Sequence, residues 1–128
     1  MNELGPWPNK RFGKAEGAEY VKFIVETVKP MIDKQYRSLP DRDNTAIMGS
    51  SMGGLISHYA IHQYPDIFSK AGIFSPSYWY SKRVYTHTRE YPLPKTARLY
   101  LMTGGKEGKD SSDDLKKMTD RLLAQKHP

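Results

Sequence analysis

Cysteine and long apolar segments are both missing from this sequence of 128 residues. The absence of cysteine excludes a scaffold held together by disulfide bonds. No run approaches the roughly 18 consecutive apolar residues of a membrane-spanning helix, so we expect no membrane association. Residues 1–7 show no positively charged segment followed by an apolar one, and we therefore expect no secretory signal. Together with the absent cysteines, this favours a cytoplasmic protein.

Acidic residues are in the minority. The chain has 20 Lys and Arg residues against 14 Asp and Glu, a formal net charge of +6 and a mean hydropathy of −0.72. A basic balance can indicate a nucleic-acid partner. Here the basic residues are scattered and interleaved with acidic ones, so we interpret them as solvated and expect no nucleic-acid partner. The length and the apolar runs predict a single folded domain over residues 1–128.

Three segments have the periodicity of amphipathic helices, with apolar residues at three- and four-residue steps. These segments are residues 17–36, 53–64 and 110–126. Pro30 lies inside the first of them, where we expect a kink or a break. Residues 81–96 are mixed in character and are expected to be irregular or briefly helical.

Short apolar runs bounded by turn residues predict three buried strands, at residues 45–48, 71–74 and 98–103. Strands that alternate with helices indicate an α/β fold with a parallel sheet flanked by helices. In such sheets the chemistry lies beyond the carboxyl ends of the strands. The segments that follow those ends are residues 49–53, 75–80 and 104–110.

The first of these segments, Gly49-Ser50-Ser51-Met52-Gly53, matches the pattern G-x-S-x-G between a predicted strand and a predicted helix. We expect a turn too sharp for side chains at its flanks, so that glycine is needed at both. Such a turn would lift the Ser51 hydroxyl clear of the sheet. The Met52 N–H, at the start of the helix, would then bind an oxyanion. A glycine-flanked turn without chemistry is the alternative.

Residues 45–55, 64–68 and 74–79 resemble the putative esterase family of α/β hydrolases, which includes siderophore esterases, relatives of S-formylglutathione hydrolase and feruloyl-esterase-like enzymes. The resemblance extends over nearly the whole chain. It implies hydrolysis of a small-molecule carboxylic ester or thioester by Ser51. It also implies further strands on both sides, so we expect a partial α/β-hydrolase fold, apparently truncated at both ends. Its open sheet edges could pair in a homo-oligomer.

The same resemblance implies an acid after the third strand, with Glu107 as the first choice and Asp110 as the second. Such an acid holds the tautomer of a catalytic histidine and stabilises its charged form. The order of the fold requires that histidine to follow the acid, and only His127 does. His127 is therefore the candidate base, although its place at the end of a helix favours a role at the helix terminus.

The remaining candidates are aromatic residues and histidines. By resemblance, Trp79 and Tyr80 border the substrate pocket as an aromatic wall, with ordinary core packing as the alternative. His58 and His62 are four residues apart on a predicted helix, but no third ligand is apparent. We therefore expect no metal and no cofactor. His87 has no visible partner in the sequence.

Two functional hypotheses follow. The first is a serine-dependent ester hydrolase. The second is a catalytically impaired, hydrolase-like fragment that acts as a binding or oligomerising module, because a convincing histidine base is hard to find and serine is a poor nucleophile without one.

Overall fold

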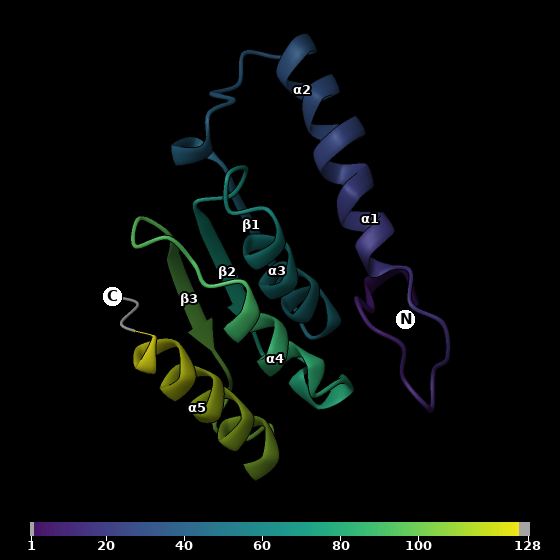
Figure 1. The fold of residues 1–128 in the computed structure, drawn as a ribbon, viewed down its shortest axis with the longest axis vertical. Helices are drawn as coiled ribbons and strands as arrows, with labels where there is room; N and C mark the ends of the chain where they lie inside the picture. Colours follow the sequence, from purple (N-terminus) through teal and green to yellow (C-terminus); the bar gives the residue numbers. More distant parts are fainter. Residues whose placement is uncertain (1, 126–128) are drawn as a thin grey trace.

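Three parallel strands form the centre of the structure, a computed structural model that describes residues 2–125 (Figure 1). The strands β1 (Ala46–Ser50), β2 (Lys70–Phe74) and β3 (Arg98–Met102) lie in the order β1-β2-β3. Both neighbouring pairs are parallel. The predicted parallel α/β sheet is confirmed, and the carboxyl ends of all three strands meet at one edge of the sheet.

Helix α3 (Met52–Gln63) follows β1 directly and packs against β1 and β2. It is buried on every side, because even its polar residues Ser57, His58 and His62 are removed from solvent. Leu55 and Ile61 on this helix belong to the same apolar core as the strand residues beneath it. The helix therefore fixes the turn that precedes it from within the core.

The long helix before the sheet continues through Pro30. It consists of α1 (Gly17–Phe23), a π-helical segment (Ile24–Val28) and α2 (Lys29–Gln35), which Figure 1 shows as one rod extending beyond the sheet. The expected break is absent, and the helix instead has a wider turn just before the proline. Because proline has no N–H to donate to the preceding turn, a local change in the hydrogen-bonding pattern is the physical response.

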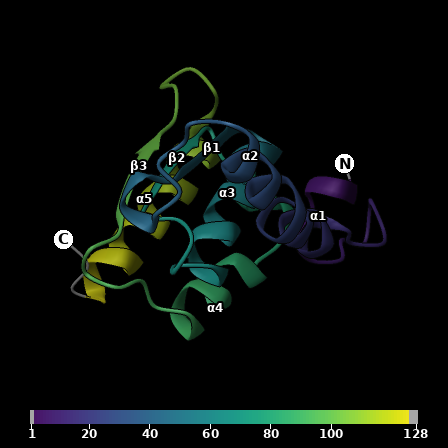
Figure 2. The ribbon, with the colours of Figure 1, turned by 90° about the horizontal axis from the view of Figure 1, so that it is seen from above.

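Two further helices complete the layer next to the sheet. Helix α4 (Arg83–Glu90) occupies the segment expected to be irregular or briefly helical, and α5 (Lys109–Ala124) is the final helix. Figure 2 shows α3 between the strands and α4. The remaining short helical turns are η1 (Asn2–Leu4), η3 (Arg42–Asn44) and η4 (Tyr78–Tyr80). Within residues 2–125, no helix has the length and apolar character required to cross a membrane.

The two faces of the sheet differ in exposure because successive side chains of a strand point in opposite directions. Ala71 and Ile73 of the central strand are buried in the core beneath the helices. On the other face, Met48 is 70% exposed and Tyr100 is 60% exposed, and both lie in the same row of the register as Gly72. The helices formed by the described residues thus leave one sheet face uncovered.

Candidate active site

Ser51 occupies the turn between β1 and α3 with an unusual backbone conformation. Its φ is 58° and its ψ is −119°, a region that residues other than glycine rarely adopt. Its N–H donates to the Phe74 carbonyl at 3.0 Å, and its own carbonyl accepts from Leu55 and Ser77, each at 3.1 Å. The end of β2 and the first turn of α3 therefore hold the strained residue in place. Ser51 is an exposed residue at the carboxyl edge of the sheet.

The glycines of this turn have different steric roles. A Cβ on Gly49 would lie 2.5 Å from the Gly53 carbonyl oxygen, and one on Gly54 would lie 3.0 Å from the Phe74 carbonyl oxygen. A Cβ on Gly53 would meet no atom of the described residues within 4 Å outside its own helix and chain neighbours. The expectation that both motif glycines are sterically required is therefore correct for Gly49 and wrong for Gly53. Gly54, which lies outside the motif, allows the loop after β2 to approach.

The amide of Met52 opens α3, a helix of 12 residues. The first N–H groups of a helix have no carbonyl partner within the helix, and the helix dipole adds partial positive charge there. The arrangement next to Ser51 is thus suited to bind an anionic oxygen.

Ser77 lies beside Ser51, although it was not among the site residues predicted from the sequence. The two hydroxyl oxygens are 3.1 Å apart, and Ser77 is only 2% exposed. The residue is in the predicted segment 75–80 at a strand's carboxyl end, which is the one signal that pointed to it. Because its buried hydroxyl contacts the Ser51 hydroxyl, Ser77 is part of the candidate site.

Glu107 links the ends of β2 and β3. Its carboxylate accepts hydrogen bonds from Ser75 Oγ at 2.7 and 2.9 Å, from Thr103 Oγ1 at 2.7 Å and from the Gly104 N–H at 2.6 Å. These donors, Ser75 foremost, hold the pKa of Glu107 below its ordinary value. The exposed Glu107 side chain is therefore an ionised carboxylate at the same edge as Ser51. Asp110 instead lies in the first turn of α5.

The histidines of the described chain form a buried cluster between α3 and α4. His58 Nε2 lies 2.8 Å from Thr88 Oγ1, and His58 Nδ1 lies 3.0 Å from the Tyr78 hydroxyl. Because the Thr88 hydroxyl donates to the Val84 carbonyl, it accepts from Nε2–H, which leaves Nδ1 to accept from Tyr78. Burial, reinforced by neighbouring histidines, keeps the pKa of His58 well below its usual value.

The other two members of this cluster are also engaged by residues other than Ser51. His62 Nδ1 donates to the Tyr91 carbonyl at 2.8 Å, and His87 Nε2 donates to Gln63 Oε1 at 3.0 Å. Burial lowers the pKa of His87 to about 4. Within residues 2–125, no group of three or more His, Cys, Asp or Glu side chains is arranged to hold a metal ion. His127 lies outside the described residues.

The two aromatic residues selected from the sequence have different environments. Trp79 is 57% exposed, whereas Tyr80 is 2% exposed. The Tyr80 ring stacks on Phe12 with centroids 6.1 Å apart, and the Asn9 side-chain amide donates to the Tyr80 carbonyl. Of the pair, only Trp79 presents its ring to solvent, while Tyr80 belongs to the core and contacts the Trp79 ring edge-on.

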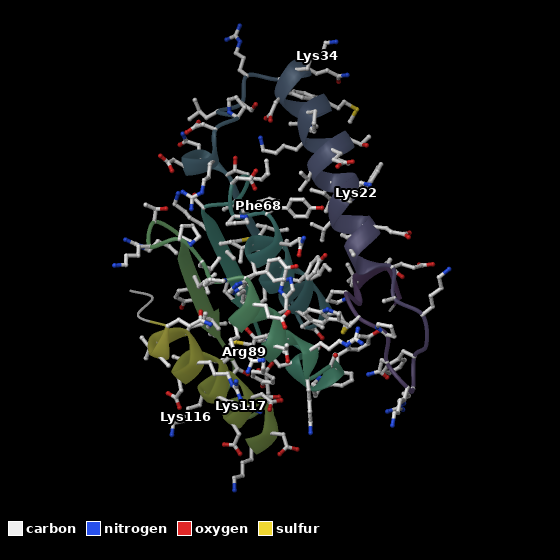
Figure 3. The ribbon with its side chains drawn as sticks, in the orientation of Figure 1. Lys22, Lys34, Phe68, Arg89, Lys116 and Lys117 are labelled. Carbon is white, nitrogen blue, oxygen red and sulfur yellow. The ribbon has the colours of Figure 1, made fainter. Side chains whose placement is uncertain are left out.

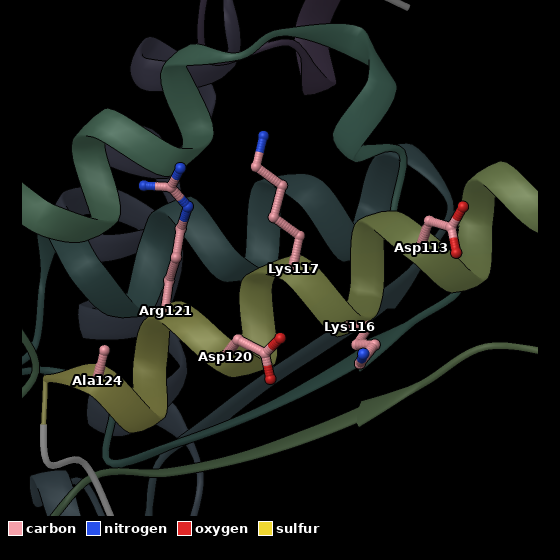
Figure 4. A pocket seen from close by; sticks show the side chains of 6 residues that line it. All are labelled: Asp113, Lys116, Lys117, Asp120, Arg121 and Ala124. Atoms are coloured by element: carbon pink, nitrogen blue, oxygen red, sulfur yellow. The ribbon is translucent and has the colours of Figure 1, made fainter.

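The basic side chains are distributed over distant helices. Figure 3 shows Lys34 near one end of the molecule, Lys22 lower on the same long helix, and Lys116 on α5 toward the other end. A hollow of about 450 Å³ follows α5, and Lys117 and Arg121 point from it toward α4 (Figure 4). Their cationic groups lie 4.2 and 5.2 Å from the centroid of the Tyr85 ring. These two cations therefore pack on an aromatic side chain between the helices.

Comparison with known proteins places this geometry in a family context. A model of the family described as "Putative esterase" matches residues 7–126. The uncharacterized protein YbbA of Bacillus subtilis (strain 168) is 33% identical over 116 residues, which cover 86% of this chain and 46% of that protein. A siderophore enterobactin esterase of Emericella nidulans is 31% identical over 74 residues, which cover 57% of this chain and 24% of that protein.

Solved structures resemble the fold over nearly the whole chain. The BES protein from Bacillus cereus matches with a TM-score of 0.81 at 22% identity, over 95% of this chain and 49% of that one. The siderophore hydrolase EstA from Aspergillus nidulans matches with a TM-score of 0.73 at 22% identity, over 95% of this chain and 53% of that one. The sheet and its helices thus form a partial α/β-hydrolase fold. The chain spans less than half the length of the curated relatives that it matches.

Proposed function

The chain belongs to the putative esterase family, and on that premise we propose that it hydrolyses small-molecule carboxylic esters or thioesters with Ser51 as the nucleophile. The observation that carries the proposal is the conformation of Ser51. A serine in a strained turn between a parallel strand and a helix, with its residue exposed, is the arrangement that a G-x-S-x-G nucleophile requires. The family match and a relative named as a siderophore esterase support an ester as the substrate.

In the proposed reaction, Ser51 Oγ bonds to the acyl carbon while its proton passes to a base. The negative charge that develops on the carbonyl oxygen is stabilised by the Met52 N–H. The carbon–oxygen or carbon–sulfur bond of the leaving group then breaks, and the base returns the proton to the departing alcohol or thiol. Water, deprotonated by the same base, releases the acid from Ser51.

We assign Glu107 as the acid that orients the base. Its Oε2 accepts from Ser75, Thr103 and Gly104, whereas Oε1 accepts from Ser75. Oε1 consequently retains the capacity for one further donor, such as an imidazole N–H. The lowered pKa of Glu107 keeps the carboxylate ionised at neutral pH, as this role requires. Asp110 is the second candidate.

The base that we propose within this chain is His127. The buried histidines are unsuited to the task because their ring nitrogens bond to Thr88, Tyr78, Tyr91 and Gln63 in the core, away from Ser51. An imidazole supplied by a second polypeptide is the other source. In either case Trp79 is the aromatic surface that contacts the substrate, and the buried Tyr80 supports its position.

Labelling with a fluorophosphonate tests the proposal, because this probe reacts preferentially with an activated serine. Wild-type protein should be labelled at Ser51 and should turn over a p-nitrophenyl ester, whereas Ser51→Ala should do neither. The His127→Ala variant should lose turnover by orders of magnitude if the base belongs to this chain. Folded wild-type protein that shows neither labelling nor turnover would contradict the hydrolase and favour a binding or oligomerising module.

A further inference from the structure

The loop after β2 is held against the turn that contains Ser51 by contacts that do not involve the Ser77 hydroxyl. The Ser77 N–H donates to the Ser51 carbonyl at 3.1 Å, and the Ser77 carbonyl accepts from the Tyr80 N–H at 3.0 Å. The next residue, Tyr78, is buried and its hydroxyl contacts His58 on α3. The backbone of Ser77 is thus fixed from both sides, and Gly54 provides the space for this close approach.

The Ser77 hydroxyl itself has one hydrogen-bonding contact among the described residues, and that contact is the Ser51 hydroxyl. Burying a hydroxyl without a hydrogen bond costs free energy. The contact with Ser51 provides the buried Ser77 hydroxyl with that hydrogen bond. The contact joins a buried residue with a hydrogen-bonded backbone, Ser77, to an exposed residue, Ser51. We therefore expect the contact to restrict the side-chain rotamer of Ser51 more than that of Ser77.

Ser51 needs such a constraint. A serine side chain has three staggered rotamers, and an exposed one exchanges rapidly among them. Attack on an acyl carbon requires the oxygen within about 3–3.5 Å of the carbon, with its proton directed at the base. A donor that occupies one lone pair of Ser51 Oγ leaves the Ser51 O–H free to point at that base.

We propose that Ser77 is a positioning residue for the nucleophile, an inference that rests on the proposed function. Its O–H donates to Ser51 Oγ and selects the rotamer in which Ser51 can transfer its own proton to the base. Ser77 gives up no proton and forms no bond to the substrate. Its contribution is to orient the attacking oxygen before the ester arrives.

The test compares Ser77→Ala and Ser77→Thr with Ser69→Ala. Ser69 is a matched control because it is also a buried serine with a hydrogen-bonded hydroxyl, but it precedes β2 at the opposite end of the sheet. We expect Ser77→Ala to lower kcat and the rate constant of fluorophosphonate labelling about tenfold, the loss of one hydrogen bond and one preferred rotamer, with KM within about twofold. Ser77→Thr retains the hydroxyl and should recover most of the rate. Ser69→Ala should match the wild type in both constants.

The outcomes separate the two proposals. Active wild-type protein with an equally active Ser77→Ala variant would overturn the positioning role and leave the ester hydrolase intact. Wild-type protein that is neither labelled nor active would overturn the proposed function and the positioning role with it. A crystal structure of the wild type gives a readout that needs no variant: Ser51 should occupy one rotamer, in contact with Ser77. Ser51 spread over several rotamers there would contradict the proposal.

Discussion

The site at the strand ends and the histidine cluster between α3 and α4 are both polar, yet they are built in opposite ways. Ser51 and Glu107 are exposed, and Ser51 is held in a strained conformation by backbone hydrogen bonds. His58 and His87 are buried, with aromatic and hydroxyl partners and lowered pKa values. The comparison shows that a residue type suited to catalysis takes a structural role when the fold places it away from the strand ends. Position relative to the sheet edge is thus more informative than residue identity.

The largest effect on the comparison is expected at Glu107, the proposed acid of the site at the strand ends. Glu107→Gln should lower kcat by about 10²–10⁴-fold, because the neutral side chain orients and stabilises a charged imidazole poorly. Asp110→Asn is the matched control and should change kcat by less than about threefold. Steady-state turnover of a p-nitrophenyl ester measures both. If Asp110→Asn produced the larger loss, the assignment of the acid would be reversed.

A substitution in the buried histidine cluster should lower the stability of the fold. His58→Ala removes the ring that Thr88 and Tyr78 contact, and leaves both hydroxyls in the core without that partner. We expect the free energy of unfolding to fall by about 2–4 kcal/mol. Denaturant titration checks this value. A variant with unchanged stability would show that the cluster is not the structural element described above.

The pH dependence of stability should also arise from the cluster. Burial lowers the pKa of His87 to about 4, from an ordinary value of 6.5. Unfolded chains therefore bind protons below pH 6.5 that the folded protein excludes, so stability should be complete above pH 6.5 and decline between 6.5 and about 4. Denaturant titrations at pH 7.5 and 5.0 measure the decline. His87→Phe should make it shallower, and an unaltered slope would contradict this account.

The smallest effect is expected at the second glycine of the motif. Gly53 lies in α3, and a Cβ there would meet no described atom within 4 Å outside its own helix and chain neighbours, so Gly53→Ala should stabilise the fold by about 0.5–1 kcal/mol. Gly49→Ala is the contrasting variant, because its Cβ would contact the Gly53 backbone. Thermal unfolding of the two proteins should move in opposite directions. Equal destabilisation would mean that the turn needs glycine on both sides.

The order of strands and helices could be predicted from the sequence because its signals are local. Apolar runs bounded by turn residues placed the strands within one or two residues of β1, β2 and β3. Pro30 predicted a kink or a break, whereas the structure shows no break and has a π-helical segment just before the proline, which is also compatible with a missing N–H. The sequence pattern around Pro30 does not distinguish a break of the helix from a π-helical segment.

The contacts of the site were less predictable because they join distant residues. Ser77 lies 26 positions after Ser51, and the two hydroxyls meet because β1 and β2 are neighbours in the sheet. The buried Tyr80 ring stacks on Phe12, which lies near the start of the sequence. A G-x-S-x-G pattern predicts where a nucleophile belongs, but it carries no information about the residues that surround it in space.

The burial of α3 on all sides has a consequence for saturation mutagenesis. In a helix with one solvent-exposed face, the exposed positions tolerate substitution at regular intervals. An intolerant position on that face then indicates a functional role. Along α3 the intolerant codons should instead form an unbroken run from Gly54 to His62, because every residue between them is buried. In such a data set, loss of abundance and loss of turnover would have to be scored separately before any position near Ser51 is interpreted as functional.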